Sequence, residues 1–187
     1  MEHTDRVEHV VVPGTFDPIT YGHIDVVRRA RRIAGRVTVA VAASLGKNGT
    51  GPALTLDERV ELARQALADE GVSEGVDVRP LTGLLVDFCH EVGAGAVVKG
   101  LRAMTDFEYE LQQADLNFRL APDVESIFVM SNPAYGYVSS SIVRELAGLG
   151  ADVSMLVPPC VVKKLREHFL SGTPILPMSW NKPPIFK

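Results

Sequence analysis

Thr15 lies in a short loop that follows the first apolar run of the sequence, Val10 to Val12, and His23 lies on the first turn of the helix predicted after that loop. The run stops at Pro13-Gly14, and a helix is predicted to begin near Tyr21-Gly22-His23. A strand, a loop and a helix amino terminus in this order bind anions, because unpaired backbone N–H groups and the positive end of the helix dipole point beyond the strand. The glycines permit close backbone approach, while Thr15 and His23 supply side-chain hydrogen-bond donors. The segment has neither the G-x-G-x-x-G nor the Walker pattern, so it favours nucleotidyl transfer.

Three further polar clusters follow apolar runs. Lys47 is the only cation of the Gly-rich loop 44–54, Lys99 to Arg102 follow a short apolar run, and Ser139 to Ser141 introduce a helical pattern. Attack on a phosphorus atom places developing negative charge on oxygens, and cations and oriented N–H groups stabilise it without covalent help. No side-chain nucleophile paired with a general base is evident, and a phosphate acceptor is already ionised near neutral pH. Direct in-line displacement is therefore the predicted mechanism.

Strand and helix patterns alternate along the chain and define the elements that must position these groups. Two capping boxes, Thr55-x-x-Glu58 and Thr105-x-x-Glu108, mark helix starts, and the helix after the second is expected to bury Phe107, Leu111, Ala114 and Phe118. The apolar runs predict strands, and the residues with a helical period predict helices. The strands are expected at 9–13, 37–43, 76–81, 96–99 and 126–130, and the remaining helices at 22–34, 84–92, 139–148 and 159–170.

This alternation predicts an α/β fold, a doubly wound five-stranded parallel sheet in a single domain. Ligands of such folds bind at the carboxyl ends of the strands, where each polar cluster described above is expected. We predict a flexible N-terminus at 1–8, the globular domain at 9–170 and a tail at 171–187, whose four prolines rule out a regular helix.

Composition excludes several classes of protein. The net charge of −4 argues against a general nucleic-acid or anionic-membrane binder, and 46% hydrophobic with 22% charged residues is ordinary for a globular protein. Cys89 and Cys160 form no C-x-x-C, so a disulfide scaffold or zinc cluster is not expected. No apolar signal segment or membrane-length run is present, so a cytoplasmic location is predicted. No metal ligand is assigned among the side chains.

The string PGTFDPITYGH at 13–23 resembles the signature of the bacterial phosphopantetheine adenylyltransferases, with Thr20 to His23 at the T/H-x-G-H motif. Lys99-Gly100-Leu101-Arg102, the block DFEYE at 106–110 and YVSSS at 137–141 extend the similarity to most of the chain. The resemblance implies a Rossmann-like nucleotidylyltransferase fold. It also implies a reaction in which ATP and 4′-phosphopantetheine give dephospho-coenzyme A and pyrophosphate, with Mg²⁺ carried by the ATP phosphates. A homohexamer, and coenzyme A as a candidate inhibitor, are implied as well.

The resemblance also assigns roles to single residues. The catalytic set is His23, Thr15, Lys47 and Arg102. Phosphopantetheine is expected at Thr15, Lys47, Leu85, Lys99 and Asn117. ATP is expected at Thr15, Phe16, His23, Gly100, Leu101, Arg102, Glu110, Tyr135, Gly136, Tyr137, Val138, Ser139, Ser140 and Ser141.

Several of these residues also have a purely structural interpretation. Lys99 and Arg102 could be solvated charges, Ser139 to Ser141 could only cap a helix, and Leu85 could be a core residue. Asp17 beside Pro18 is expected to stabilise its loop. Lys99 stands where many relatives carry Arg, which keeps the charge but loses the bidentate fork. An enzyme acting on nicotinamide mononucleotide or glycerol phosphate, and an ATP sensor without turnover, remain alternatives.

Overall fold

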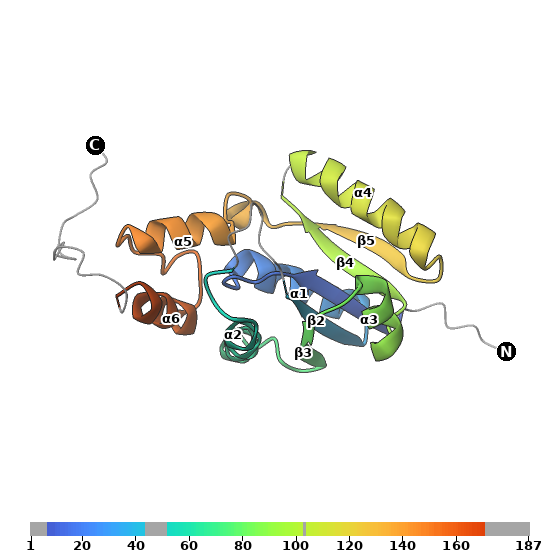
Figure 1. Ribbon diagram of the computed structural model, residues 1–187, viewed down its shortest axis with the longest axis horizontal. Helices are drawn as coiled ribbons and strands as arrows, with labels where there is room; N and C mark the ends of the chain where they lie inside the picture. Colours follow the sequence, from blue (N-terminus) through green and yellow to red (C-terminus); the bar gives the residue numbers. More distant parts are fainter. Residues whose placement is uncertain (1–6, 44–51, 103, 171–187) are drawn as a thin grey trace.

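The computed structural model describes residues 7–43, 52–102 and 104–170, and within them it confirms the predicted doubly wound sheet (Figure 1). The five strands are parallel, in the order β3-β2-β1-β4-β5. The order reverses between β1 and β4, which places the topological switch point at their carboxyl ends. The strands are β1 (His9–Gly14), β2 (Arg36–Ala42), β3 (Val76–Leu81), β4 (Ala96–Leu101) and β5 (Glu125–Met130).

Helices connect successive strands, and two more follow the sheet. Thr20 and Thr55 are the N-cap residues of α1 and α2, and each makes a reciprocal capping box with the residue three positions later. The box predicted at Thr55-x-x-Glu58 is therefore confirmed. The helices are α1 (Tyr21–Ile33), α2 (Leu56–Asp69), α3 (Leu85–Val92), α4 (Met104–Leu120), α5 (Ser140–Gly148) and α6 (Pro159–Leu170), with a 3-10 turn at Pro133–Tyr135.

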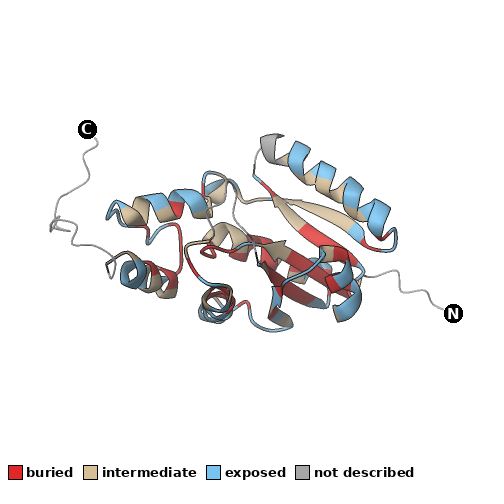
Figure 2. Cartoon of the chain, viewed as in Figure 1, coloured by how far each residue is buried: buried red, intermediate tan, exposed pale blue. Residues whose placement is uncertain are grey.

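Alternate residues of the strands enter two separate cores. Val10 and Val12 pack with α1, α2, α5 and α6 on one face, whereas Val11 packs with α3 on the other. This two-residue alternation is the geometry of a strand covered on both sides, which is why the apolar runs were continuous. Figure 2 shows the buried residues concentrated in the central strands, while the outer side of α4 is exposed.

Three sequence predictions about β4 and α4 were wrong. β4 does not end at Lys99, because Gly100 and Leu101 continue the parallel pairing with β5 as far as Met130. α4 begins at Met104, so Thr105 lies inside the helix and not at its N-cap. Of the side chains expected to point inward, Leu111 and Phe118 are instead exposed, by 42% and 57%. An apolar period alone does not tell whether a helix faces its own core or another surface.

Helices α5 and α6 lie together beyond one end of the sheet (Figure 1). The Tyr21 N–H at the start of α1 donates to the Leu156 carbonyl, at 3.1 Å. The Ser140 hydroxyl at the start of α5 donates to the Pro18 carbonyl, at 2.8 Å. These bonds bring the C-terminal helices to the carboxyl end of β1. No helix among the described residues is sufficiently long and apolar to cross a membrane.

Candidate active site

His23 occupies the third position of α1 and is part of that helix's own cap. Its backbone N–H donates to Thr20 Oγ1 at 3.4 Å, and its ring Nδ1 accepts the Thr20 backbone N–H at 3.0 Å. A glutamate or glutamine usually fills this position of a capping box. Here the imidazole does so, and its orientation is consequently fixed by the start of the helix.

The same hydrogen bonds determine the chemical state of His23. Because Nδ1 accepts a backbone N–H, it is unprotonated, and the proton of the neutral ring is on Nε2. Desolvation by burial, with a smaller contribution from the positive charge of Arg102, lowers the pKa of His23 to about 4. At neutral pH the side chain is therefore an uncharged Nε2–H donor.

Phe16 packs beside His23. Its backbone is in the left-handed region, with φ of 47°, and its buried ring meets the imidazole edge-on, with 5.0 Å between ring centroids. The ring also covers Gly14, where a Cβ atom would lie 2.9 Å from Phe16 Cζ. A side chain at position 14 would displace the ring, so this position requires glycine. Thr15, between them, is exposed.

Arg102 links the end of β4 to the segment before α5. Its Nη1 donates to the Val138 carbonyl at 3.0 Å, and its charge acts on His23. The predicted ATP residues Phe16, His23, Arg102 and Val138 thus come from four separate stretches of the chain and influence one another through the ring contact, the Arg102 charge and this hydrogen bond. Gly100, in β4 just before Arg102, has no room for a side chain, because a Cβ there would lie 2.5 Å from Val26 Cγ2 of α1.

The loop after β5 is held in place from α1. Asp25 is buried and accepts hydrogen bonds from Arg29 Nε at 2.8 Å and from the Asn132 N–H at 3.2 Å. Asn132 in turn caps the 3-10 turn through Ala134 N–H. Tyr135, the last residue of that turn, stacks against Tyr21. Gly136 is partly buried and Tyr137 is exposed after it.

Lys99 and Glu110, which the resemblance assigned to different substrates, face each other. Lys99 Nζ lies 3.1 Å from Glu110 Oε2, and both side chains are largely buried. Apart from this ion pair, that oxygen has no hydrogen-bond partner in the described part of the chain. Glu110 is therefore not an ordinary solvated surface acid, and its carboxylate, already paired with Lys99, can accept from one further donor.

Asp17 has the structural role that the sequence predicted for it. Its carboxylate accepts the backbone N–H groups of Ala53 and Leu54, at 2.8 and 3.0 Å, and pairs with Arg144 of α5. Arg144 also donates to the Asp17 carbonyl. Asp17 thereby fastens the loop after β1 to the start of α2 and to α5.

Arg59 and Arg144 were not found from the sequence. Arg59, on α2, is only 2% exposed, and its guanidinium donates to the carbonyls of Thr15, Ala42 and Leu54. Arg59 lies in an ordinary helical sequence, and its acceptors are backbone atoms of distant segments. The only available sequence signal was an arginine on the face of α2 that the apolar stripe predicts to be buried.

The remaining predicted residues lie at the edges of this group or outside the description. Leu85, the first residue of α3, packs against the second core, and Asn117 is partly buried on α4, two turns beyond Glu110. Ser139 is the N-cap of α5 and accepts from Ile142 N–H, so its capping role is confirmed, with Ser140 and Ser141 in the first turn. Lys47 and the tail 171–187 fall outside the described residues.

Other reactive groups in the described part of the chain offer no second centre. Burial raises the pKa of both the Cys89 and Cys160 thiols to about 11, so neither is an activated nucleophile. No three His, Cys, Asp or Glu side chains among the described residues are grouped to hold a metal ion.

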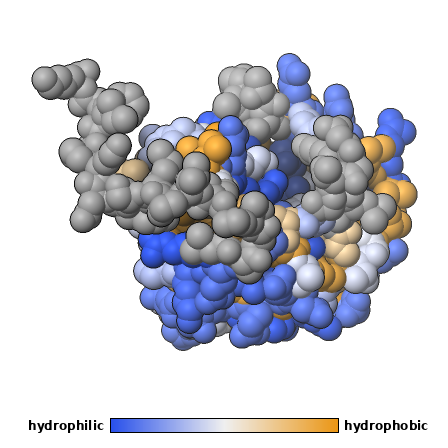
Figure 3. Space-filling view, turned by 60° about the vertical axis from the view of Figure 1, so that its left-hand side comes forward, coloured by the Kyte–Doolittle hydropathy of each residue, from blue (hydrophilic) through white to orange (hydrophobic). Residues whose placement is uncertain are grey.

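The space-filling view from the side of α5 and α6 shows hydrophobic residues as separate patches within a mostly hydrophilic surface (Figure 3).

The chain is similar to known proteins along most of its length. Residues 11–146 match the cytidylyltransferase-like family model. A phosphopantetheine adenylyltransferase of Nitrosomonas eutropha is 48% identical over 161 residues, covering 86% of this chain and 94% of that protein. One from Nitratidesulfovibrio vulgaris is 43% identical over 173 residues, covering 92% and 90%.

Solved structures support the fold. A putative nicotinate-nucleotide adenylyltransferase from Vibrio parahaemolyticus superposes with a TM-score of 0.62 at 16% identity, covering 89% of this chain and 96% of that one. A bifunctional NMN adenylyltransferase/ADP ribose pyrophosphatase from Francisella tularensis gives a TM-score of 0.64 at 14% identity, covering 88% and 51%.

Proposed function

The chain belongs to the cytidylyltransferase-like family and, within it, to the phosphopantetheine adenylyltransferases, and from this we propose that it transfers the adenylyl group of ATP to 4′-phosphopantetheine. The products are dephospho-coenzyme A and pyrophosphate, in coenzyme A synthesis. The observation that carries the proposal for this site is the convergence of predicted ATP residues at the switch point of the sheet: the Phe16 ring meets His23, the Arg102 charge acts on His23, and Arg102 donates to the Val138 carbonyl.

The transfer is a direct in-line displacement. A phosphate oxygen of phosphopantetheine forms a bond to the α-phosphorus of ATP while the bond from that phosphorus to the bridging oxygen breaks, and pyrophosphate carries away the electron pair. The neutral Nε2–H of His23 donates to the oxygens of the reacting phosphate, where negative charge increases in the transition state. Arg102 adds positive charge on the ATP side.

The two substrates bind on either side of the end of β4. The buried Oε2 of Glu110, which is paired with Lys99, can accept a further hydrogen bond from a ribose hydroxyl of ATP. Lys99, with Thr15 and Lys47, holds the phosphate of phosphopantetheine. Mg²⁺ enters with the ATP phosphates, since such ions commonly keep water and phosphate ligands and the described residues group no three carboxylate, histidine or cysteine side chains for one. When bound, the ion neutralises phosphate charge.

Self-association through the outer side of α4 is part of the proposal. Leu116, Phe118 and Leu120 of α4 are exposed by 54–62%, and Met130 on the edge strand β5 by 66%. An exposed apolar surface of this kind is typical of a contact between subunits. The count of six subunits rests on the family resemblance. Light scattering of Phe118→Asp beside the unchanged protein tests it, and a monomeric unchanged protein would refute it.

A turnover assay tests the reaction itself. The protein is mixed with ATP, Mg²⁺ and 4′-phosphopantetheine, and pyrophosphate release is followed with His23→Ala as the control. Nicotinamide mononucleotide and glycerol phosphate are offered as alternative acceptors. A preference for either would assign a different substrate, and ATP binding without turnover of any acceptor would indicate a nucleotide sensor.

A further inference from the structure

We propose that Arg59 is a positioning residue for adenylyl transfer, which orients the Thr15–Phe16 peptide group so that its N–H faces the reacting phosphates. The inference rests on the proposed function. Arg59 is the fourth residue of α2, is only 2% exposed and donates to backbone carbonyls, so its effect on the reaction is exerted through the backbone that it holds.

The Arg59 guanidinium contacts backbone carbonyls of three separate segments. Nη1 donates to the Thr15 carbonyl at 2.7 Å and to the Ala42 carbonyl at 2.8 Å, and Nε donates to the Leu54 carbonyl at 3.1 Å. These carbonyls belong to the loop after β1, to the end of β2 and to the start of α2. The rigid planar guanidinium can satisfy three such acceptors at fixed angles, whereas a lysine ammonium cannot reproduce that fork.

The geometry of the Thr15–Phe16 peptide determines where the Phe16 N–H points. In a trans peptide the C=O and N–H groups of one plane point in opposite directions. The Thr15–Phe16 bond is trans, because the cis bond in this loop is Asp17–Pro18. With the Thr15 carbonyl held by Arg59, the Phe16 N–H must point away from the guanidinium. No residue in the described part of the chain accepts a hydrogen bond from it.

The backbone at this peptide needs its surroundings to hold it in place. Phe16 has a positive φ, a conformation that a residue with a side chain adopts only when its surroundings impose it. The Phe16 ring is fixed against Gly14 and His23, and the carbonyl on its other side is fixed by Arg59. The nearby Asp17 carboxylate partly compensates the buried positive charge. Arg59 therefore orients a backbone donor beside the imidazole that the mechanism uses.

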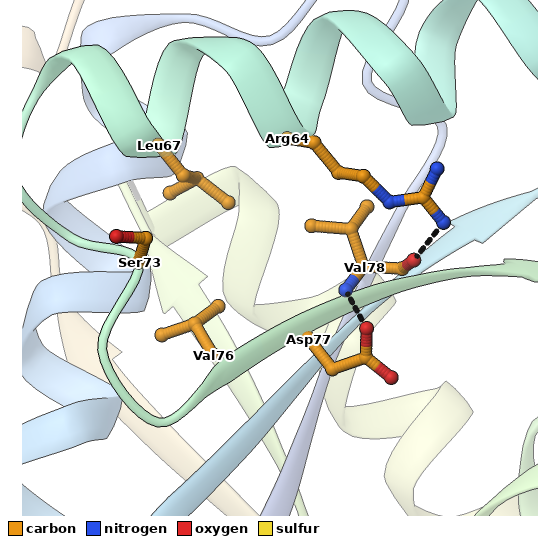
Figure 4. Close-up of a pocket in the computed structure, with 6 residues that line it drawn as sticks. All are labelled: Arg64, Leu67, Ser73, Val76, Asp77 and Val78. Carbon is orange, nitrogen blue, oxygen red and sulfur yellow. Dashed lines mark hydrogen bonds between the residues drawn. The ribbon is translucent and has the colours of Figure 1, made fainter.

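The test compares Arg59→Lys with Arg64→Lys. Arg64 is a suitable control, because it lies on the same helix and also donates to a strand carbonyl, that of Val78 at 2.8 Å. Figure 4 shows this contact near the amino end of β3, beside a cavity of about 130 Å³, whereas the candidate site lies at the carboxyl ends of the strands. Both variants lose a guanidinium contact to the backbone, but only one loses it next to Phe16.

We expect Arg59→Lys to lower kcat per folded molecule by about 10-fold or more, because a misdirected preorganised donor loses part of the 10²–10³-fold effect of such a group. The Kd of ATP measured by calorimetry should change less than about 3-fold, and Arg64→Lys should keep the kcat of the unchanged protein. The folded fraction is measured by circular dichroism at the assay temperature, so that a loss of folded protein is not counted as a loss of rate.

The outcomes separate the hypotheses. An unchanged kcat per folded molecule in Arg59→Lys would overturn the inference, as would an equal fall in Arg64→Lys. If Arg59→Lys does not fold, Arg59→Gln is measured in the same way, and failure of both to fold beside a folded Arg64→Lys would assign Arg59 to stability alone and overturn it too. An unchanged protein that turns over none of its substrates would instead refute the proposed function.

Discussion

The sharpest prediction concerns the stability of the protein as the pH falls, because His23 has a titratable ring as one half of a helix cap. Its native pKa is about 4, against 6.5 for the exposed group. Below pH 6.5 the unfolded chain takes up a proton on His23 and the native protein does not, so the unfolded state is favoured as the pH falls. The stability of the native state is thus highest above pH 6.5 and is lost progressively down to about pH 4.

The linkage relation gives the magnitude. With pKa values of 6.5 and about 4, the free energy of unfolding falls by about 2 kcal/mol between pH 7 and pH 5, and by about 3 kcal/mol in total at still lower pH. The matched variant is His23→Gln. Glutamine is a preferred partner at this position of a capping box, since its carbonyl oxygen can accept the Thr20 N–H, and it does not titrate.

The assay is urea unfolding of both proteins at pH 5, 6, 7 and 8. We expect the stability of the unchanged protein relative to His23→Gln to fall by about 2 kcal/mol from pH 7 to pH 5. Other titrating groups, including the buried His9, are present in both proteins and cancel in the difference. A difference that stays constant across this range, or an NMR titration of His23 with a midpoint near 6.5, would refute the structural account of the ring.

Three further predictions follow from single contacts. His23→Ala should lower kcat by roughly 10²-fold with a smaller effect on ATP affinity, and steady-state kinetics that show a change only in KM would contradict its transition-state role. Gly100→Ala should destabilise the protein by about 1–3 kcal/mol in urea unfolding, because its Cβ would overlap Val26 Cγ2, and adding Val26→Ala should restore much of the loss. Glu110→Gln should raise the KM for ATP, since a neutral amide oxygen is a weaker acceptor for ribose, while it frees Lys99; an unchanged KM for ATP would argue against the ribose contact.

The β1–α1 region was predictable from the sequence because its requirements are local. Glycine beside a buried aromatic ring, and threonine three residues before His23, leave a signature within a few positions of the chain. Asp17 beside a proline was likewise correctly interpreted as a loop residue. The use of the His23 ring as a helix cap was not predicted, because the rule for capping boxes expects Glu or Gln.

Two features were beyond the sequence for physical reasons. Arg59 binds backbone carbonyls, and a carbonyl carries no information about residue type, so nothing in positions 15 or 42 indicates a guanidinium partner. Leu111 and Phe118 have the period of a buried stripe, yet they are exposed in the chain. Hydrophobic periodicity indicates that one face of a helix is to be buried, but it does not tell whether the chain's own core or another surface buries it.

The arrangement of α4 ties the assembly of the protein to its chemistry. Glu110 and Leu111 are neighbours in that helix, the first turned toward Lys99 and the second exposed on the outside. The Phe107 ring meets the Phe128 ring of β5 edge-on, at 6.0 Å between centroids, and adds a second attachment to the sheet. If a neighbouring subunit covers the outer side, it stiffens the helix that carries Glu110, the residue proposed to accept from the ribose of ATP, so dilution that separates the subunits should weaken nucleotide affinity before it unfolds the chain.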